Sequence, residues 1–196
     1  MRAAAFQFPI ALLILAACRQ NQPPRADPAS LAGAEAAVAA LAQDTAAFAG
    51  TTGVVRRTRA PAPGAPPAIL SAVHVAAQPG YDRVVFELAG HSLPGYHVEY
   101  ATRAVVRCGS GDPVSIAGAA RLVVRLEPAQ AHDERGNATV VERERAPGLP
   151  AIKEMKLVCD FEGQVEWVLG VAVATPYRVL EAAGPARLTL DVRHAR

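Results

Sequence analysis

The sequence has few aromatic residues, few cysteines, no long apolar run and almost no excess of charge. Of its 196 residues, 5% are Phe, Trp or Tyr, 3 are Cys, and the formal net charge is +2. Without a run of about 18 apolar residues, the chain has no conventional membrane-spanning helix. The nearly balanced charge argues against nucleic-acid binding, because such proteins carry a clustered basic excess. At this length the chain accommodates one domain with appendages.

The first 17 residues have the features of a secretory signal peptide. A positive start, Met1-Arg2, precedes an uncharged and mostly apolar stretch at residues 3–15. As a helix this stretch is roughly 20 Å long, against about 30 Å for the hydrocarbon core of a bilayer. It therefore suits the apolar region of a signal peptide and is too short to span.

This stretch ends in Leu15-Ala16-Ala17-Cys18, which resembles the bacterial lipobox, where small residues precede the cysteine that becomes the lipidated N-terminus. Cys18 is therefore the expected lipidation site. Two or more acyl chains would hold the protein stably on the extracytoplasmic side of a membrane. Residue 19 is Arg and not Asp, which by resemblance to other lipoproteins favours the outer membrane where the cell has two. The alternative is an ordinary secretory signal in which Cys18 is incidental.

Residues 18–67 have the composition of a flexible linker that begins at the lipid anchor site. They are rich in Ala, Pro, Gln, Thr and Gly, and residues 61–67 (PAPGAPP) are typical of an extended, solvated segment. Arg56, Arg57 and Arg59 form a basic group that can contact acidic lipid or a wall polymer. The alternative is a plain solvated linker.

From residue 68 to 196 the sequence predicts an all-β domain. Short runs alternate apolar and polar residues between Gly and Pro, the pattern of half-buried strands. The side chains expected to face the core are Val84, Phe86, Leu88, Leu122, Val124, Leu126, Leu188, Leu190 and Val192. Those expected to face outward are Arg83, Val85, Glu87, Arg121, Val123, Arg125, Arg187, Thr189 and Asp191.

Further strands are expected at residues 69–75, 96–102, 105–108, 155–161, 165–171 and 177–180. About nine short strands without a helical pattern indicate a sandwich or a barrel. Trp167 shares its strand parity with apolar neighbours, so we expect it in the core.

Charged residues four apart recur in these runs, as Arg83 with Glu87 and Arg187 with Asp191. Residues i and i+4 of a strand lie on one face, so each run presents a charged pair over an apolar inner face. We expect cross-strand ion pairs worth about 0.2–1 kcal/mol each. The alternative is that Arg83 or Arg187 faces a ligand.

Two cysteines remain in the domain, and an oxidising compartment favours a disulfide between Cys108 and Cys159. Cys108 shares its parity with Val106, and Cys159 with Leu157 and Phe161, so we expect both to face inward. The chain-entropy model gives roughly 4 kcal/mol for a loop of about 50 residues. The alternatives are free buried thiols or a metal site, although zinc-site spacing is lacking.

A long ordered series of motifs in this region resembles the AMIN-like domain of bacterial envelope lipoproteins. The motifs are GYDRVVFEL (80–88), PGYHVEY (94–100), AHDE (131–134), PGLP (147–150), DFEG (160–163), WVLG (167–170), PYRV (176–179) and PARLTLDV (185–192). The resemblance covers essentially all of residues 68–196. It implies a β-sandwich of short antiparallel strands related to AMIN domains, which accompany cell-wall amidases and secretins and help to place them in the envelope by binding peptidoglycan. It brings no established activity to this chain, and Cys108 and Cys159 stand where the family pattern has other residues.

Eight residues are candidate ligand contacts. Tyr81, Tyr96 and Tyr100 are expected to be exposed enough to contact a glycan, because aromatic rings offer apolar faces with a polar tip. The other candidates are Asp82, Arg83, His132, Asp133 and Glu134. The last three lie in a long polar connection over residues 127–151, and a connection of this length is usually functional or mobile.

The segment His132-Asp133-Glu134 has two interpretations. It is either a metal or acid–base site, although no second His or acid lies at ligand spacing, or a place where Asp133 caps a turn. The sequence has no Ser in a G-x-S-x-G elbow, no nucleophile with a partner His and no phosphate-cradling loop. We therefore expect no catalytic residue, no metal and no cofactor.

Three hypotheses of function follow, in order of preference. The first is a non-enzymatic, lipid-anchored envelope protein whose β-sandwich binds peptidoglycan or another envelope component. The second is a structural or interaction module in which an uncovered sheet edge pairs with a strand of a partner protein. The third is a metal-dependent enzyme that uses the His132 loop.

Overall fold

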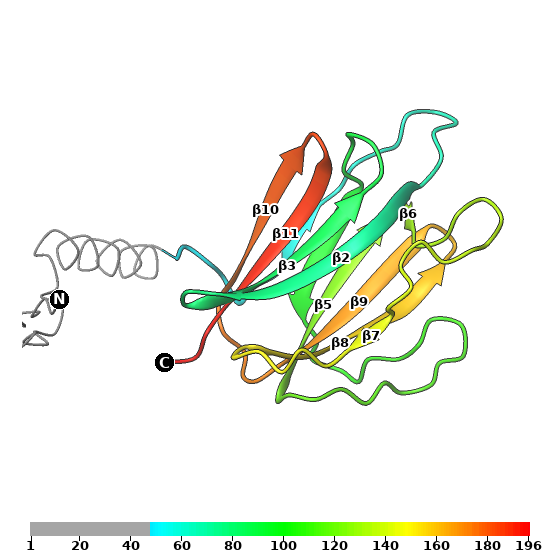
Figure 1. The fold of residues 1–196 in the computed structure, drawn as a ribbon. Helices are drawn as coiled ribbons and strands as arrows, with labels where there is room; N and C mark the ends of the chain where they lie inside the picture. Colours follow the sequence, from blue (N-terminus) through cyan, green and yellow to red (C-terminus); the bar gives the residue numbers. More distant parts are fainter. Residues whose placement is uncertain (1–47) are drawn as a thin grey trace, which may run out of the picture. The chain divides into compact units, whose positions relative to one another are not determined.

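Two β-sheets packed face to face form the part of the chain that the structure, a computed structural model, describes: residues 48–196 (Figure 1). The strands are β1 (Val55–Arg57), β2 (Ala68–Gln78), β3 (Tyr81–Leu88), β4 (Gly95–Tyr100), β5 (Ala120–Glu127), β6 (Ala129–Gln130), β7 (Glu144–Arg145), β8 (Ile152–Phe161), β9 (Gln164–Val171), β10 (Tyr177–Ala183) and β11 (Ala186–Arg193). No helix in this part of the chain is long and apolar enough to cross a membrane. The predicted signal peptide and the predicted lipidation site, Cys18, lie outside the described residues.

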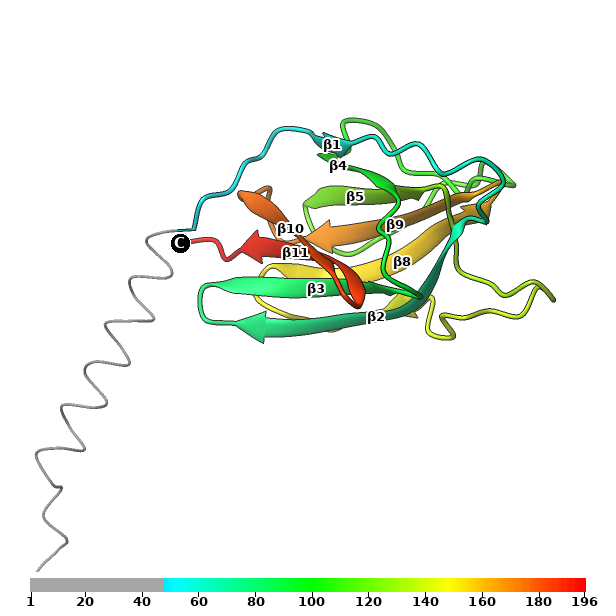
Figure 2. The same ribbon diagram turned by 90° about the horizontal axis from the view of Figure 1, so that it is seen from above.

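The larger sheet has the strand order β1-β4-β5-β9-β8-β7, and the smaller has the order β10-β11-β3-β2-β6. Neighbours pair antiparallel, except that β2 and β6 pair in parallel over two residues. Seen from above, the two sheets form two layers (Figure 2). The predicted β-sandwich is confirmed.

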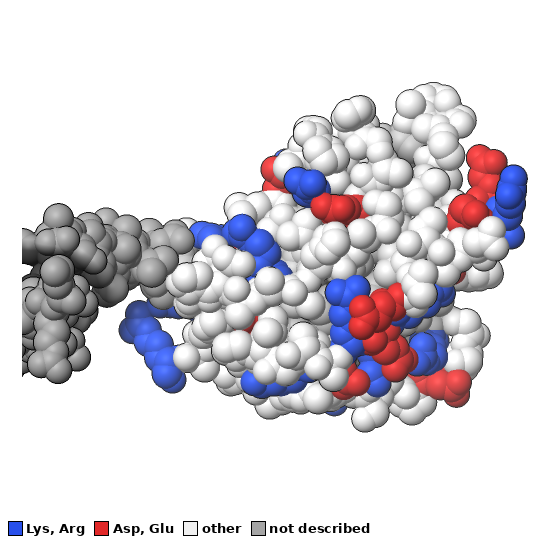
Figure 3. Space-filling model, in the orientation of Figure 1, with Lys and Arg blue, Asp and Glu red and all other residues white. Residues whose placement is uncertain are grey.

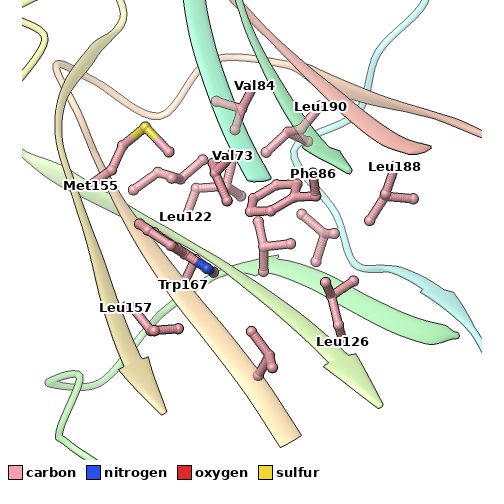
Figure 4. Packing of buried hydrophobic residues seen from close by; sticks show 14 of the residues in the cluster. Val73, Val84, Phe86, Leu122, Leu126, Met155, Leu157, Trp167, Leu188 and Leu190 are labelled. Carbon is pink, nitrogen blue, oxygen red and sulfur yellow. The ribbon is translucent and has the colours of Figure 1, made fainter. Parts of the chain in front are cut away.

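The core lies between the two sheets. All nine side chains that the alternation assigned to the core are at most 3% exposed. Trp167 of β9 is fully buried and meets Phe86 of β3 edge-on, with ring centroids 6.4 Å apart (Figure 4). Because these two rings come from opposite sheets, they hold the layers together, and the prediction that Trp167 is a core residue is confirmed.

The predicted cross-strand ion pairs are also present. In the register of β11 on β3, Asp191 lies opposite Arg83 and Arg187 opposite Glu87. The Arg83 guanidinium is 2.7 Å from Asp191, and that of Arg187 is 2.9 Å from Glu87. Asp191 is nevertheless 0% exposed, because Arg178 of β10 also covers its carboxylate, at 2.8 Å.

The fold begins before residue 68, which corrects the predicted boundary of the linker. Residues 48–59, called the N-terminal strap from here on, contribute β1, which pairs antiparallel with β4 from Val55 to Arg57. Phe48 at the start of the strap is 7% exposed. The composition of the strap resembles a linker, yet partners that are distant in the sequence supply its contacts.

A second apolar cluster covers part of the outer face of the larger sheet. Its members are Val105, Val114, Ile116, Val123, Val158 and Val168. Val123 lies on the outer face, as predicted, but the connection at residues 101–119 lies over the strands here and leaves Val123 only 8% exposed. Gly170 of β9 permits this contact, because a Cβ at that position would collide with the carbonyl oxygen of Ala117.

The predicted disulfide joins Cys108 of this connection to Cys159 of β8, with the Cα atoms 5.2 Å apart. Two details of the prediction are wrong. Residues 105–108 form no strand, apart from a single bridge between Val106 and Pro113, and Cys108 and Val106 face outward. Cys159 does not face the inter-sheet core either: a bulge at residues 157–159 of β8 places it opposite Glu166 on the outer face, where it is 5% exposed, and Phe161 is 60% exposed.

Candidate binding cleft

The N-terminal strap runs along one edge of the sandwich and contacts both sheets (Figure 2). The Phe48 ring lies 5.8 Å from the Tyr81 ring of β3 and 4.6 Å from the Arg178 guanidinium of β10. Thr51 and Tyr177 then exchange two backbone hydrogen bonds of 2.8 Å. The strap is therefore fixed to the smaller sheet before it joins the larger one as β1.

Tyr177 fastens the strap to β4 with its hydroxyl group. The phenolic oxygen lies 2.6 Å from the carbonyl oxygen of Gly53 and 2.7 Å from that of Val98, so it donates its one proton to either. Burial raises the pKa of Tyr177 to about 12, which keeps the proton in place at neutral pH. One side chain thus links the strap, β4 and β10.

Glu181 of β10 holds the far end of the strap. Its carboxylate is 2.6 Å from the Arg59 guanidinium and 3.5 Å from that of Arg57, and it accepts a hydrogen bond of 2.7 Å from the Tyr96 hydroxyl. Burial alone would raise the pKa of Glu181, but the Tyr96 hydroxyl and the Arg59 guanidinium outweigh it and lower the pKa below its ordinary value. An ionised Glu181 therefore keeps residues 57–59 against the sandwich.

A row of basic and imidazole side chains crosses the outer face of the larger sheet. Arg56 of β1 lies opposite His97 of β4, His97 opposite Arg125 of β5, and Arg125 opposite Glu166 of β9. Residues directly opposite one another in antiparallel strands point to the same face. The register thus gathers three residues that are far apart in the sequence.

A cleft of about 480 Å³ opens along this row and is called the arginine cleft here. Its walls include residues 56–59 of the strap, Gly95, His97 and Glu99 of β4, and Arg125 and Glu127 of β5. The Arg125 guanidinium is 2.7 Å from Glu166, whereas Arg56 is exposed and has no ion pair with any of residues 48–196. The cleft thus presents a free guanidinium to solvent.

Gly95 allows the two walls of the cleft to come together. A Cβ at this position would lie 2.8 Å from the carbonyl oxygen of Glu127 and 3.0 Å from that of Arg57. A larger residue would therefore push the strap away from β4 or distort β5.

An apolar cleft of about 720 Å³ adjoins the arginine cleft, since Arg59, Pro61 and Pro128 line both. Its remaining walls come from the Ala- and Pro-rich residues 60–69 and from residues 89–94. A polar cleft and an apolar one therefore lie next to each other along the strap, which suits an extended ligand more than a compact one.

The three tyrosines predicted to be exposed are not. Tyr81 is 8% exposed and Tyr96 is 7% exposed, while Tyr100 is half-buried and donates a hydrogen bond of 2.7 Å to the carbonyl oxygen of Thr175. The rings fill the space where the strap and the sheets meet, and the hydroxyls of Tyr96 and Tyr100 are used within the fold. Of these three, only Tyr96 lines the arginine cleft.

Asp82 and Arg83 also have partners within the fold. The fully buried Asp82 carboxylate accepts hydrogen bonds from the amides of Ala151 and Ile152, at 2.7 and 2.8 Å, and lies 2.7 Å from His194 Nε2. These contacts tie β3 to the start of β8 and to the C-terminal residues. The structure does not bring either residue into the arginine cleft.

In the His132 segment, Asp133 caps a turn, as one of the two interpretations predicted. Its Oδ1 accepts hydrogen bonds from the amides of Arg135 and Asn137, at 2.9 and 2.8 Å. The Asn137 contacts lower the pKa of Asp133, and Glu134 is exposed. The connection at residues 127–151 is more ordered than expected, because it contains β6 and β7.

His132 itself pairs with a carboxylate outside this segment. Its Nδ1 lies 2.9 Å from Asp160, whose other oxygen is 2.9 Å from the Arg143 guanidinium. Within residues 48–196, no three His, Cys, Asp or Glu side chains are grouped so that they could hold a metal ion.

The sequence singled out Arg56, Arg57 and Arg59 but not the residues that face them. His97, Glu99, Arg125 and Glu127 reach the cleft through strand register, and no local motif marks them. The alternation of charge with apolar residues in β4 and β5 was the available signal, but it does not tell which strands are neighbours.

Acidic and basic side chains stand next to one another on the face drawn in Figure 3, rather than in a patch of one sign. This distribution agrees with the 14 Lys and Arg and 15 Asp and Glu in residues 68–196. On this face, charges of both signs therefore form small mixed groups and no broad field of one sign.

Comparison with protein-family models matches residues 68–194 to the AMIN-like domain. Comparison with the curated proteins and with the solved structures gives no match. The matched segment covers more than half of the chain and includes β2 to β11, whereas the strap precedes it.

Proposed function

Because the chain belongs to the AMIN-like domain family, we propose that it is a lipid-anchored, non-catalytic envelope protein that binds peptidoglycan in the arginine cleft. The family itself points to an envelope-associated, peptidoglycan-binding type of module. The observation that carries the proposal for this chain is the open cleft of about 480 Å³ on the outer face of β1, β4 and β5.

The form of the cleft suits a polymer. It continues into the apolar cleft of about 720 Å³ along residues 59–69 and 89–94. Peptidoglycan offers both matching surfaces on its peptide stems, which carry charged groups beside the apolar methyl groups of alanine. A polymer that repeats these groups can occupy both clefts with one extended segment.

Co-sedimentation with purified peptidoglycan tests this proposal. The full chain, in detergent, is mixed with insoluble sacculi, and the pelleted fraction is compared with that of the heat-denatured chain. We expect the native chain alone to pellet, and salt to weaken binding because exposed charges are screened. Equal recovery of native and denatured chain would refute the proposal.

A matched pair of variants assigns the binding to the cleft. Arg56→Gln removes the unpaired guanidinium of the cleft, and Arg135→Gln removes the guanidinium of another exposed residue, in the turn capped by Asp133. The first should bind weakly and the second like the wild type. The same loss in both variants would mean that only net charge matters.

The lipid anchor is tested separately. We expect Cys18→Ala to move the protein from the membrane fraction to the soluble fraction, because the lipid is attached at that thiol. A variant that fractionates like the wild type would contradict the anchor and leave the cleft proposal standing.

A second candidate function rests on the free edge of β10. Beyond Tyr177, which pairs with Thr51, β10 has no strand partner other than β11 among the described residues. Leu180 on this edge is 43% exposed. An extended segment of a partner protein would add a strand here, and crosslinking from residues 179–183 to one stoichiometric protein would favour this function.

A further inference from the structure

The arginine cleft carries both signs of charge in a fixed order. Arg56, His97 and Arg125 form the central row across β1, β4 and β5. On one side of the row lies Glu99 of β4, two residues beyond His97. On the other side lies Glu127 of β5, two residues beyond Arg125 and opposite Gly95. The two acids therefore flank the row, each about 7 Å from it along a strand.

The charged side chains of the cleft differ in whether they already have an ion-pair partner within the fold. Arg56 has no ion pair among residues 48–196, and neither has Glu127, and both are exposed. By contrast, Arg125 is paired with Glu166, and Glu99 is 3.3 Å from His97. The cleft thus offers one free guanidinium and one free carboxylate, each open to a partner on a ligand.

Peptidoglycan presents charge only on its peptide stems. Each stem has free carboxylates, and a stem with diaminopimelate also has a free ammonium group, whereas the N-acetylated sugars are neutral. A guanidinium binds a carboxylate with charge-assisted hydrogen bonds, and a carboxylate does the same with an ammonium group. A neutral glycan would leave both free charges of the cleft without a counterpart.

We infer that the arginine cleft recognises the peptide stem and not the glycan strand, with Arg56 binding a stem carboxylate and Glu127 a stem ammonium group. This inference rests on the proposed function, since it names the part of peptidoglycan that the cleft contacts. Gly95 contributes by its lack of a side chain, which lets the backbones of Arg57 in the strap and Glu127 in β5 approach it closely from both sides.

Competition against sacculus binding tests the inference with three soluble probes. The probes are the tetrapeptide L-Ala–D-Glu–diaminopimelate–D-Ala, the same tetrapeptide with its carboxylates converted to amides, and a chitin oligosaccharide. We expect the free tetrapeptide to release the full chain from sacculi. The amidated form should need about tenfold higher concentration, the loss of one charge-assisted contact. The oligosaccharide should not compete.

Variants repeat the test from the protein side. Arg56→Gln should weaken the affinity for the free tetrapeptide about tenfold and leave that for the amidated tetrapeptide unchanged. Arg135→Gln should change neither, and circular dichroism checks that both variants are folded.

The outcomes separate this inference from the function on which it rests. Competition by the oligosaccharide, or equal competition by the free and amidated tetrapeptides, overturns stem recognition while peptidoglycan binding stands. Failure of the wild-type chain to bind intact sacculi overturns both.

Discussion

Removal of the Cys108–Cys159 disulfide should cost about 4 kcal/mol of unfolding free energy. The bond closes a loop with a sequence separation of 51 residues. In the chain-entropy model a loop of this size gives about 4 kcal/mol. For a domain of this size that corresponds to a fall in Tm of roughly 8–16 °C. The bond also holds residues 101–119 over Val123 and Val168, so their release should be local as well as global.

Cys108→Ser is the suitable variant, because Cys108 is exposed whereas Cys159 is 5% exposed. Urea unfolding of the full chain gives the change in free energy, and hydrogen exchange shows whether residues 101–119 lose protection. Added reductant should bring the wild type to the stability of the variant and leave the variant unchanged. A loss below about 1 kcal/mol, or unchanged exchange in this connection, would show that the disulfide neither limits the unfolded chain nor holds residues 101–119 in place.

Three other substitutions test the contacts that build the cleft and the fold. Tyr177→Phe should cost about 2 kcal/mol, because the carbonyls of Gly53 and Val98 lose the one hydroxyl proton that they share, and should raise hydrogen exchange across the strap. The raised pKa of Tyr177, about 12 against 10.0 in its ordinary state, predicts that the wild type loses stability as the pH rises from 10 toward 12 and that the variant loses less; equal alkaline titrations would contradict this. Gly95→Ala should cost about 1–3 kcal/mol and weaken sacculus binding, because the added Cβ meets the Glu127 carbonyl; unimpaired binding would show that the strap does not need this close approach. Asp82→Asn should cost about 3 kcal/mol in thermal unfolding, because the amide places a donor against the donors that surround Asp82; an unchanged Tm would mean that the site rearranges.

The alternation in the sequence predicted the central strands because their burial is a local property. In β3 and β11 every second residue faces the core, and this period can be read without knowledge of the partner strand. β1 was missed for the opposite reason. Its three residues, Val-Arg-Arg, have no apolar period, and their place in the sheet depends on partners in β4, on Tyr177 and on Glu181, which are 39 or more residues away.

Distant contacts also explain why the sequence did not predict which side chains of the candidate site are buried. Tyr81 and Tyr96 were expected at the surface because a phenol has a polar tip, but the tip of Tyr96 is satisfied by Glu181 inside the fold. The burial of Asp191 could not be predicted for the same reason. Its position in the strand faces outward, and two arginines from neighbouring strands cover its carboxylate. The cysteine pair was predictable because the domain has two cysteines and the expected oxidising compartment favours a disulfide, which needs no knowledge of neighbouring strands.

Chemical-shift mapping shows where on the domain peptidoglycan binds, and so whether it occupies the arginine cleft. The isotope-labelled full chain in detergent is titrated with soluble disaccharide-peptide fragments of peptidoglycan, and its backbone amides are followed by NMR. We expect the largest shifts on Val55–Arg57 and Gly95–Tyr100, two of the three strands that line the cleft. Largest shifts at residues 131–138, or no shift at all, would contradict it.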